Sequence, residues 1–186
     1  MIGHDGPVHD EASAEADPTL DAAQEQAPEA VAPPSARLLA DFLSAEKDRV
    51  LAAMWAVYAT RDDEILLPLA RQVSQIRRAT ADIDLGGIVA SHRSNLEHAL
   101  DRLTLAGSGR CLCGAYPSHP MYNPVKEEAK QHVRIVGTEP NPRQWEADRI
   151  CECCDCGRRF QVEQGEYHYT WWGWRPIDAE PGRARR

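Results

Sequence analysis

Six cysteines, all in the C-terminal half of the chain, limit what this sequence can fold into more than any other feature. They form an early pair and a late cluster, Cys111 and Cys113 followed by Cys151, Cys153, Cys154 and Cys156. Cysteines this close in sequence cannot bridge one another without strain, whereas thiolates two or three residues apart can converge on a single cation. The spacing therefore favours a metal site over local disulfides.

The rest of the sequence is consistent with a reducing environment. The chain does not open with a basic stretch followed by an apolar one, as a secretory leader does, and no run approaches the roughly 20 apolar residues of a membrane span. We therefore expect a cytoplasmic protein without membrane contact, in which the cysteines serve metal binding or redox chemistry.

The late cluster has the local pattern of a metal knuckle. Cys153 and Cys156 are separated by two residues, and Gly157 allows the backbone to reverse into a strand on which Phe160 covers the site. This pattern resembles the knuckle of zinc-ribbon proteins, over the C-terminal part of the chain only. The resemblance implies a small antiparallel sheet around a structural zinc ion, and it names a fold rather than a function. Zinc ribbons usually carry two knuckles with two-residue gaps, whereas the early pair here has a gap of one.

We predict that one structural Zn²⁺ ion is bound by four thiolates, those of Cys111, Cys113, Cys153 and Cys156. A second frame, Cys151 with Cys154, has the same spacing, but Gly157 follows Cys156 as the turn requires. Cys151, Cys154 and His119 remain alternative ligands. A redox-sensitive thiol set also stays open, and an iron–sulfur cluster would take four thiolates too, but the ribbon pattern around Gly157 favours zinc.

Charge is distributed unevenly along the chain. Residues 1–34 hold eight acidic side chains and no Lys or Arg, in a background of Ala, Pro and Gln, which predicts a disordered acidic tail. The other residues hold all 21 Lys and Arg and, because the chain has 29 acidic residues, 21 Asp and Glu, so the net charge of -8 resides in the tail. The part expected to fold is neutral and lacks the large basic field of a strong nucleic-acid binder.

Residues 35–106 are predicted to form a helical module. Apolar residues recur at helical spacing over 35–60, from Asp62 or Asp63 through Ile76, and over 84–105, after which Gly107 provides a stop. Three such helices predict an antiparallel helical hairpin or a three-helix bundle. A core this small is marginal by itself, so we expect the module to pack on the ribbon or to form a homodimer.

Residues 107–178 are predicted to form the zinc-ribbon-like antiparallel β-sheet, and residues 179–186 a basic flexible end, so the fold class is α+β. Extended segments are expected at 132–136 and 147–153. A second hairpin pairs 159–163 with 167–172 and turns at Gln164–Gly165.

An aromatic strand ends this module. If 167–172 is extended, alternate residues face opposite sides, and a ribbon this small buries only one of the two rows. The other row either packs beneath the C-terminal segment or forms an exposed stacking platform for bases or for a protein. The candidate binding surface comprises five aromatic residues and three nearby arginines: Tyr167, Tyr169, Trp171, Trp172, Trp174, Arg158, Arg159 and Arg175.

Together these patterns favour a non-enzymatic protein. A catalytic zinc needs three protein ligands and an open position, whereas four thiolates make a closed structural site. The sequence contains neither a His-Glu-x-x-His motif nor a phosphate-binding glycine loop. By analogy with other zinc ribbons, we expect the ribbon and the helical module to bind nucleic acid or a nucleic-acid-processing complex. The alternatives are a protein-interaction adaptor without nucleic-acid contact and a redox-sensitive zinc regulator.

Overall fold

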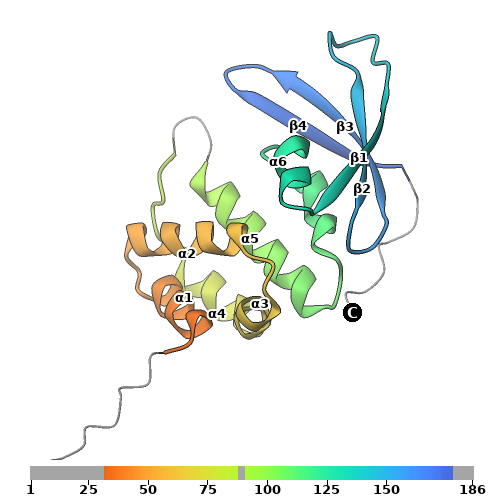
Figure 1. The fold of residues 1–186 in the computed structure, drawn as a ribbon. Coiled ribbons are helices and arrows are strands. Elements are labelled where there is room, and N and C mark those ends of the chain that lie inside the picture. The colour runs from red at the N-terminus through yellow and green to blue at the C-terminus, as the bar shows by residue number, and fades with distance from the viewer. Residues whose placement is uncertain (1–31, 88–90, 178–186) are drawn as a thin grey trace, which may run out of the picture. The chain divides into compact units, whose positions relative to one another are not determined.

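Helices occupy the first part of the described chain and strands the last part (Figure 1). The structure, a computed structural model, describes residues 32–87 and 91–177. The predicted basic end, 179–186, and all but the last three residues of the predicted acidic tail, 1–34, lie outside these ranges. The helices are α1 (Pro34–Leu43), α2 (Lys47–Ala59), α3 (Asp63–Ala70), α4 (Val73–Ala79), α5 (His92–Gly107), the 3₁₀ helix η1 (Leu112–Ser118) and α6 (Pro124–Ala129).

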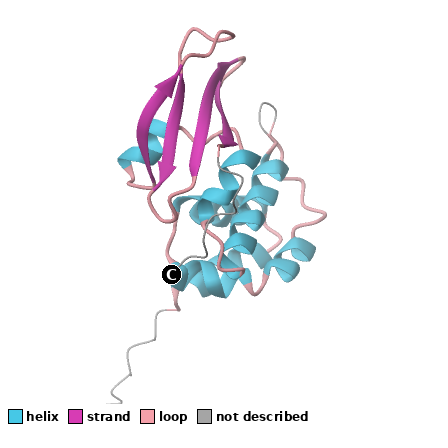
Figure 2. Cartoon of the chain, turned by 90° about the vertical axis from the view of Figure 1, so that its right-hand side faces the viewer, coloured by secondary structure: helices cyan, strands magenta, loops and turns pink. Residues whose placement is uncertain are grey.

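The strands follow the helices and complete the predicted α+β class, which is confirmed. They are β1 (Val133–Glu139), β2 (Asp148–Cys153), β3 (Arg159–Glu166) and β4 (Thr170–Pro176). All four form one antiparallel sheet in the order β1-β2-β3-β4, so each strand pairs with its neighbour in sequence (Figure 2).

The first predicted helix is in fact two helices. The chain leaves α1 at Ser44, whose hydroxyl donates to the Asp41 carbonyl (2.8 Å), and Ala45 adopts a left-handed conformation with φ +59°. The left-handed conformation costs an alanine roughly 1–2 kcal/mol. Phe42 and Val50, on either side of the break, are both fully buried. The helical spacing of apolar residues therefore continues across the break, and this spacing alone could not predict that the helix is interrupted.

The other two helical predictions also change at their boundaries. The second periodic segment divides into α3 and α4 at Arg71–Gln72, and the third helix begins at His92 with Ser91 as its N-cap rather than near 84. Before it, the Asp84 carboxylate accepts from the Gly86 amide (2.9 Å), and Gly86 has φ +69°. Asp favours this turn because its carboxylate can accept from the backbone two residues on, and Gly favours it because it adopts positive φ without a steric cost. Within the described residues, five α-helices therefore replace the three predicted ones.

Two clusters of buried side chains hold the described part of the chain together as one compact unit. The first lies among helices α1 to α5, and the second packs under the sheet. The 3₁₀ helix η1 contributes to both, because Leu112 and Ala115 belong to the helical cluster while Cys113 and Tyr116 belong to the sheet cluster. This short segment therefore links the two cores.

One face of the sheet packs on the second cluster. Inner-face residues alternate along the strands and include Phe160, Val162 and Trp174, and η1 packs against β4 while α6 packs against β1. The outer face carries charged pairs such as Arg134 with Glu152 (2.6 Å). Strand β1 shifts its register between Ile135 and Gly137, which marks a bulge near its middle. A shift of β3 by one residue would turn Phe160 and Val162 away from this cluster, so their burial favours the observed register.

The second hairpin turns later than the sequence predicts. Strand β3 continues through Gln164–Gly165 to Glu166, and the turn lies at 167–169. Gly165 is directly opposite Trp171, whose indole lies where a side chain at Gly165 would be. Here glycine marks close packing by an aromatic ring inside a strand and not a reversal of the chain.

Among the described helices, of which α5 is the longest with 16 residues, none combines the length and apolar composition needed to cross a membrane. The cytoplasmic location stays a prediction.

We predict that Gly165→Ala destabilises the sheet. The added Cβ would overlap the Trp171 indole, so the ring has to leave its place across the strand, at a cost of about 1–3 kcal/mol in the free energy of unfolding. Chemical denaturation monitored by tryptophan fluorescence measures this loss. Gly137→Ala on β1 is the matched control, since no atom lies within 4 Å of its added Cβ. Equal stability of the two variants would contradict the packing role of Gly165.

Candidate metal centre

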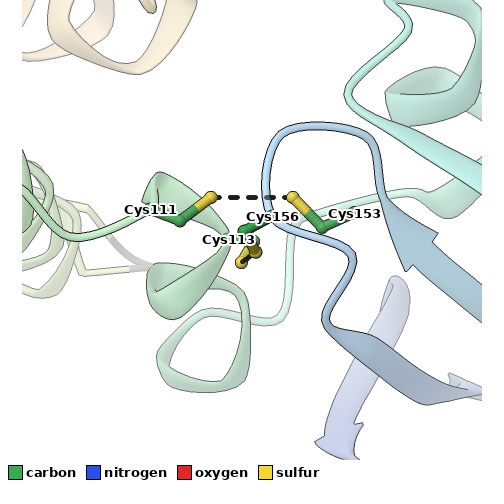
Figure 3. A group of neighbouring side chains, drawn as sticks. All are labelled: Cys111, Cys113, Cys153 and Cys156. Atoms are coloured by element: carbon green, nitrogen blue, oxygen red, sulfur yellow. Dashed lines mark hydrogen bonds between the residues drawn. The ribbon is translucent and has the colours of Figure 1, made fainter. Parts of the chain in front are cut away.

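Four cysteine sulfurs meet where η1 faces the turn between β2 and β3 (Figure 3). Cys111 and Cys113 come from the start of η1, where the Gly114 amide donates to the Cys111 carbonyl (3.0 Å). This tight 3₁₀ turn lets two thiols separated by a single residue point to the same place. The one-residue gap is therefore compatible with a paired knuckle.

The late pair is presented by a second tight turn. Cys153 ends β2, and its carbonyl accepts from the amide of Gly157 (2.9 Å), which closes a turn around Cys156. Gly157 has φ +72°, a conformation that favours glycine, so its predicted role in the reversal is observed. Phe160 follows on β3 and is fully buried in the sheet cluster.

The distances between the sulfurs suit a shared cation. Cys111 Sγ and Cys153 Sγ are 3.6 Å apart, Cys113 Sγ and Cys156 Sγ are 3.4 Å apart, and all four lie within 4.8 Å of one another. A disulfide would need about 2.05 Å. Four sulfurs around a tetrahedral zinc ion, with Zn–S bonds of about 2.3 Å, are about 3.8 Å apart. The group could hold a metal ion, and its donor set is one that Zn²⁺ takes.

The ionisation of the four thiols depends on their contacts with one another. Hydrogen bonds from Cys111 and Cys113 lower the pKa of Cys153 to about 2, whereas hydrogen bonds with Cys111 and Cys153, together with burial, raise the pKa of Cys113. Three of the four side chains are buried, and Cys156 is half-buried. Four thiolates crowded in such a place repel one another unless a positive charge compensates them.

The alternative ligands lie elsewhere. Cys151 is fully buried in the sheet cluster, where burial raises its pKa to about 12, and Cys154 is exposed. The backbone amide of Cys154 donates to the His132 carbonyl (3.0 Å), which fixes the knuckle to the start of β1. His119 is bonded through Nε2 to Asn95 Oδ1 (2.9 Å). None of these three side chains belongs to the group of four sulfurs.

A chain of polar side chains leads from the sulfur group to the residue before β1. Arg61, between α2 and α3, pairs with Asp155 in the knuckle (2.6 Å) and donates to the Tyr116 hydroxyl (2.7 Å). That hydroxyl donates to Glu127 Oε2 (3.0 Å), which also accepts from His132 Nδ1 (2.8 Å). The Cys111 sulfur lies 4.0 Å from the Asp155 carboxylate. Sequence reasoning missed this chain, because its partners are separated by up to 94 residues and no motif links them.

The aromatic strand is divided between the two faces of the sheet. Trp172 and Trp174 belong to the inner face, and Trp174 is almost completely buried, with its indole N–H donating to the Tyr122 carbonyl (2.8 Å). Trp171 lies on the outer face across Gly165. These three rings are thus engaged within the sheet.

Three exposed aromatic residues lie at the end of the sheet away from the cysteines. Tyr167 and Tyr169 are in the β3–β4 turn, where Tyr167 is 81% exposed, and Trp145, in the loop between β1 and β2, is fully exposed. Both connections are at the opposite end of the strands from the β2–β3 turn that carries Cys156. Sequence reasoning missed Trp145, whose signal is a lone tryptophan in a loop rich in proline and polar residues.

The arginines of the candidate surface do not form a free basic patch. Arg175 lies 3.4 Å from Asp148 and 3.9 Å from Glu163, and the half-buried Arg158 points a nitrogen, Nε, into the protein. Arg159 is exposed and also takes part in interactions. Paired guanidinium groups are less available to phosphate oxygens than unpaired ones.

A second group that the sequence did not reveal is a buried polar cluster between α5 and the segment after η1. The rings of His98 and His119 are 4.4 Å apart, and His98 Nε2 lies 2.7 Å from the Tyr122 hydroxyl, which also accepts from Arg102 (3.1 Å). Burial, followed by the charges of His119 and Arg102, lowers the pKa of His98 to about 3, and burial lowers the pKa of His119 to about 4. Both histidines are therefore neutral at neutral pH.

The chain has no significant match among protein-family models, curated proteins or solved structures.

We predict that acid destabilises the protein through these two histidines. Each binds a proton near pH 6.5 when unfolded but only near pH 3 or 4 when folded, so the stability that they contribute is present above about pH 6.5 and is lost as the pH falls. Each should lower the free energy of unfolding by about 1.4 kcal/mol per pH unit between about pH 6 and pH 4. Urea denaturation across this range measures the slope.

Two variants isolate the histidine contribution. His119→Gln should reduce the slope by about 1.4 kcal/mol per pH unit, whereas His168→Gln, in the exposed β3–β4 turn, should leave it unchanged. Acid release of any bound metal affects both variants equally, since both keep all six cysteines. The same slope in both variants would show that His119 is not the titrating group.

Proposed function

We propose that this protein is a non-enzymatic binding module whose sheet is held in place by one structural zinc ion at Cys111, Cys113, Cys153 and Cys156. The observation that carries the proposal is the convergence of four sulfurs from two turns, with every pair within 4.8 Å. Four protein thiolates complete a tetrahedral site and leave no position for a reacting water, which is the arrangement of structural zinc sites.

The proposed role of zinc follows from where the sulfurs lie. Cys111 and Cys153 are 42 residues apart, and the ion would join the 3₁₀ helix that links both cores to the turn at one end of the sheet. The second core is small, so metal binding would supply a large share of the free energy that orders the sheet. The role of the ion is then structural, because it holds the sheet against η1.

The expected metal content is one zinc per chain, measured by native mass spectrometry and elemental analysis. Serine at any of the four proposed ligand positions should release the ion and lower the unfolding temperature, because three remaining thiolates bind zinc much more weakly. Cys151→Ser and Cys154→Ser are the matched controls and should retain the metal. Retention by Cys153→Ser together with loss by Cys154→Ser would assign the other frame.

The proposed binding surface is the end of the sheet that carries Trp145, Tyr167 and Tyr169. Its exposed rings are of the kind that anchor protein interfaces. Single-stranded nucleic acid needs both stacking rings and free cations, whereas Arg149 near this end pairs with Glu146 (3.5 Å) and the neighbouring Arg175 pairs with Asp148. We therefore favour a protein partner over nucleic acid.

An oligonucleotide titration separates these two partner classes. With the zinc-loaded full chain, we expect fluorescence anisotropy to show no binding of a random single-stranded oligonucleotide tighter than about 0.1 mM at low salt. Binding that is tight at low salt and weakens steeply as salt is added would instead support nucleic acid as the partner. Loss of such binding in a double variant, Tyr167→Ser with Tyr169→Ser, would show that the bases bind at this end of the sheet.

A further inference from the structure

A cavity of about 370 Å³ opens between α2 and α6, and no cysteine lines it. Its wall includes Trp55 and Tyr58 of α2, His119 and Tyr122 from the segment after η1, and Glu127 and Lys130 at the end of α6. The volume is at the small end of the range of ligand sites. Trp55 at the cavity is 46% exposed, so the site is open to solvent and to small ligands.

Four neighbouring rings form an aromatic wall along one side of the cavity. Trp55 and Tyr58 have centroids 5.2 Å apart and are turned by 49°, and Tyr58 and His119 are 5.4 Å apart and turned by 66°. His119 and Tyr122 are 6.0 Å apart and turned by 75°. All four rings line the cavity, so they bound it on the side of α2 and of the segment after η1. His119 is neutral, since burial lowers its pKa to about 4, so the wall carries no positive charge of its own.

A carboxylate lies in the same cavity. Burial alone would raise the pKa of Glu127, but the hydrogen bond and charge of His132, with the charge of Lys130, lower it to about 2. Oε2 accepts from Tyr116 and His132, whereas Oε1 is 3.4 Å from the ammonium of Lys130, a long contact made by a side chain that is 57% exposed. The structure itself thus places an alkylammonium beside Oε1, and that contact is weak enough for a better-fitting cation to replace it.

We propose that this cavity binds an organic cation, specifically an N-methylated alkylammonium group, carried either by a small molecule or by a lysine side chain. Aromatic faces attract such a cation through their quadrupoles, and the attraction increases when water is excluded. Glu127 Oε1 supplies the opposite charge, and the methyl groups contact the apolar part of the wall. The site is independent of the proposed metal role, because its lining residues include none of the sulfur ligands.

Isothermal titration calorimetry of the zinc-loaded full chain with choline tests the proposal. We expect saturable binding with a Kd of about 1 mM or tighter. The neutral analogue of choline, in which carbon replaces the ammonium nitrogen, has the same shape and should bind about tenfold more weakly or worse. Equal binding of the neutral analogue would overturn the proposal.

Three variants assign the binding to this cavity. Trp55→Leu should weaken choline binding about tenfold, and Lys130→Met, which removes the competing ammonium but keeps the alkyl chain, should strengthen it about threefold. Leu67→Ala, a change of an exposed apolar side chain outside the cavity, should leave the Kd unchanged. Choline binding that is insensitive to Trp55→Leu would also overturn the proposal.

A short peptide with a trimethylated lysine distinguishes the two sources of the cation. If the trimethylated peptide binds more tightly than choline and the unmethylated peptide does not, the cavity recognises a methylated lysine side chain. If choline binds more tightly than the peptide, the ligand is a free small molecule. Both results support recognition of an alkylammonium by the cavity, whereas failure of both probes to saturate contradicts it.

Discussion

The architecture depends on the meeting of two tight turns, one at the start of η1 and one between β2 and β3. Each turn presents two sulfurs, and the four sulfurs lie close enough to share a cation. The same meeting brings Asp155 to Arg61, and through Tyr116 it connects the knuckle to α6 and β1. Bringing the turns together buries most of the thiols and crowds all four, and both burial and mutual repulsion disfavour their ionised form. A cation at the sulfurs would remove the largest of these costs.

The knuckle could be predicted because its information is local. Two cysteines three positions apart, followed by a glycine that must adopt a left-handed conformation, specify a turn without reference to the rest of the chain. The helix boundaries are different. Apolar periodicity reports which residues are buried, and Phe42 and Val50 are buried on either side of a break at Ala45 that leaves the period intact. The hairpin turn was misplaced for a related reason, since Gly165 faces an indole and does not reverse the chain.

The surroundings of the site could not have been predicted from sequence patterns. Arg61 and Asp155 are 94 residues apart, and Tyr116 and Glu127 belong to different helices, so only the folded chain brings them together. The same holds for the four rings of the cavity, which come from α2 and from the segment after η1. For the aromatic strand, the sequence identified the segment but not the orientation of its side chains. The concentration of Trp and Tyr indicated an unusual strand, but which rings are buried depends on the pairing register, and the sequence alone left that register open.

The order of strands in the sheet has a consequence for how the chain reaches this structure. Every strand pairs with its neighbour in sequence, so the sheet can form from short-range contacts, whose loop-closure entropy is small. The two late sulfurs come together within one turn of that sheet, whereas Cys111 has to approach Cys153 across 42 residues. A nascent sheet would therefore present two sulfurs first, and the early pair would have to join them by closing the longer loop.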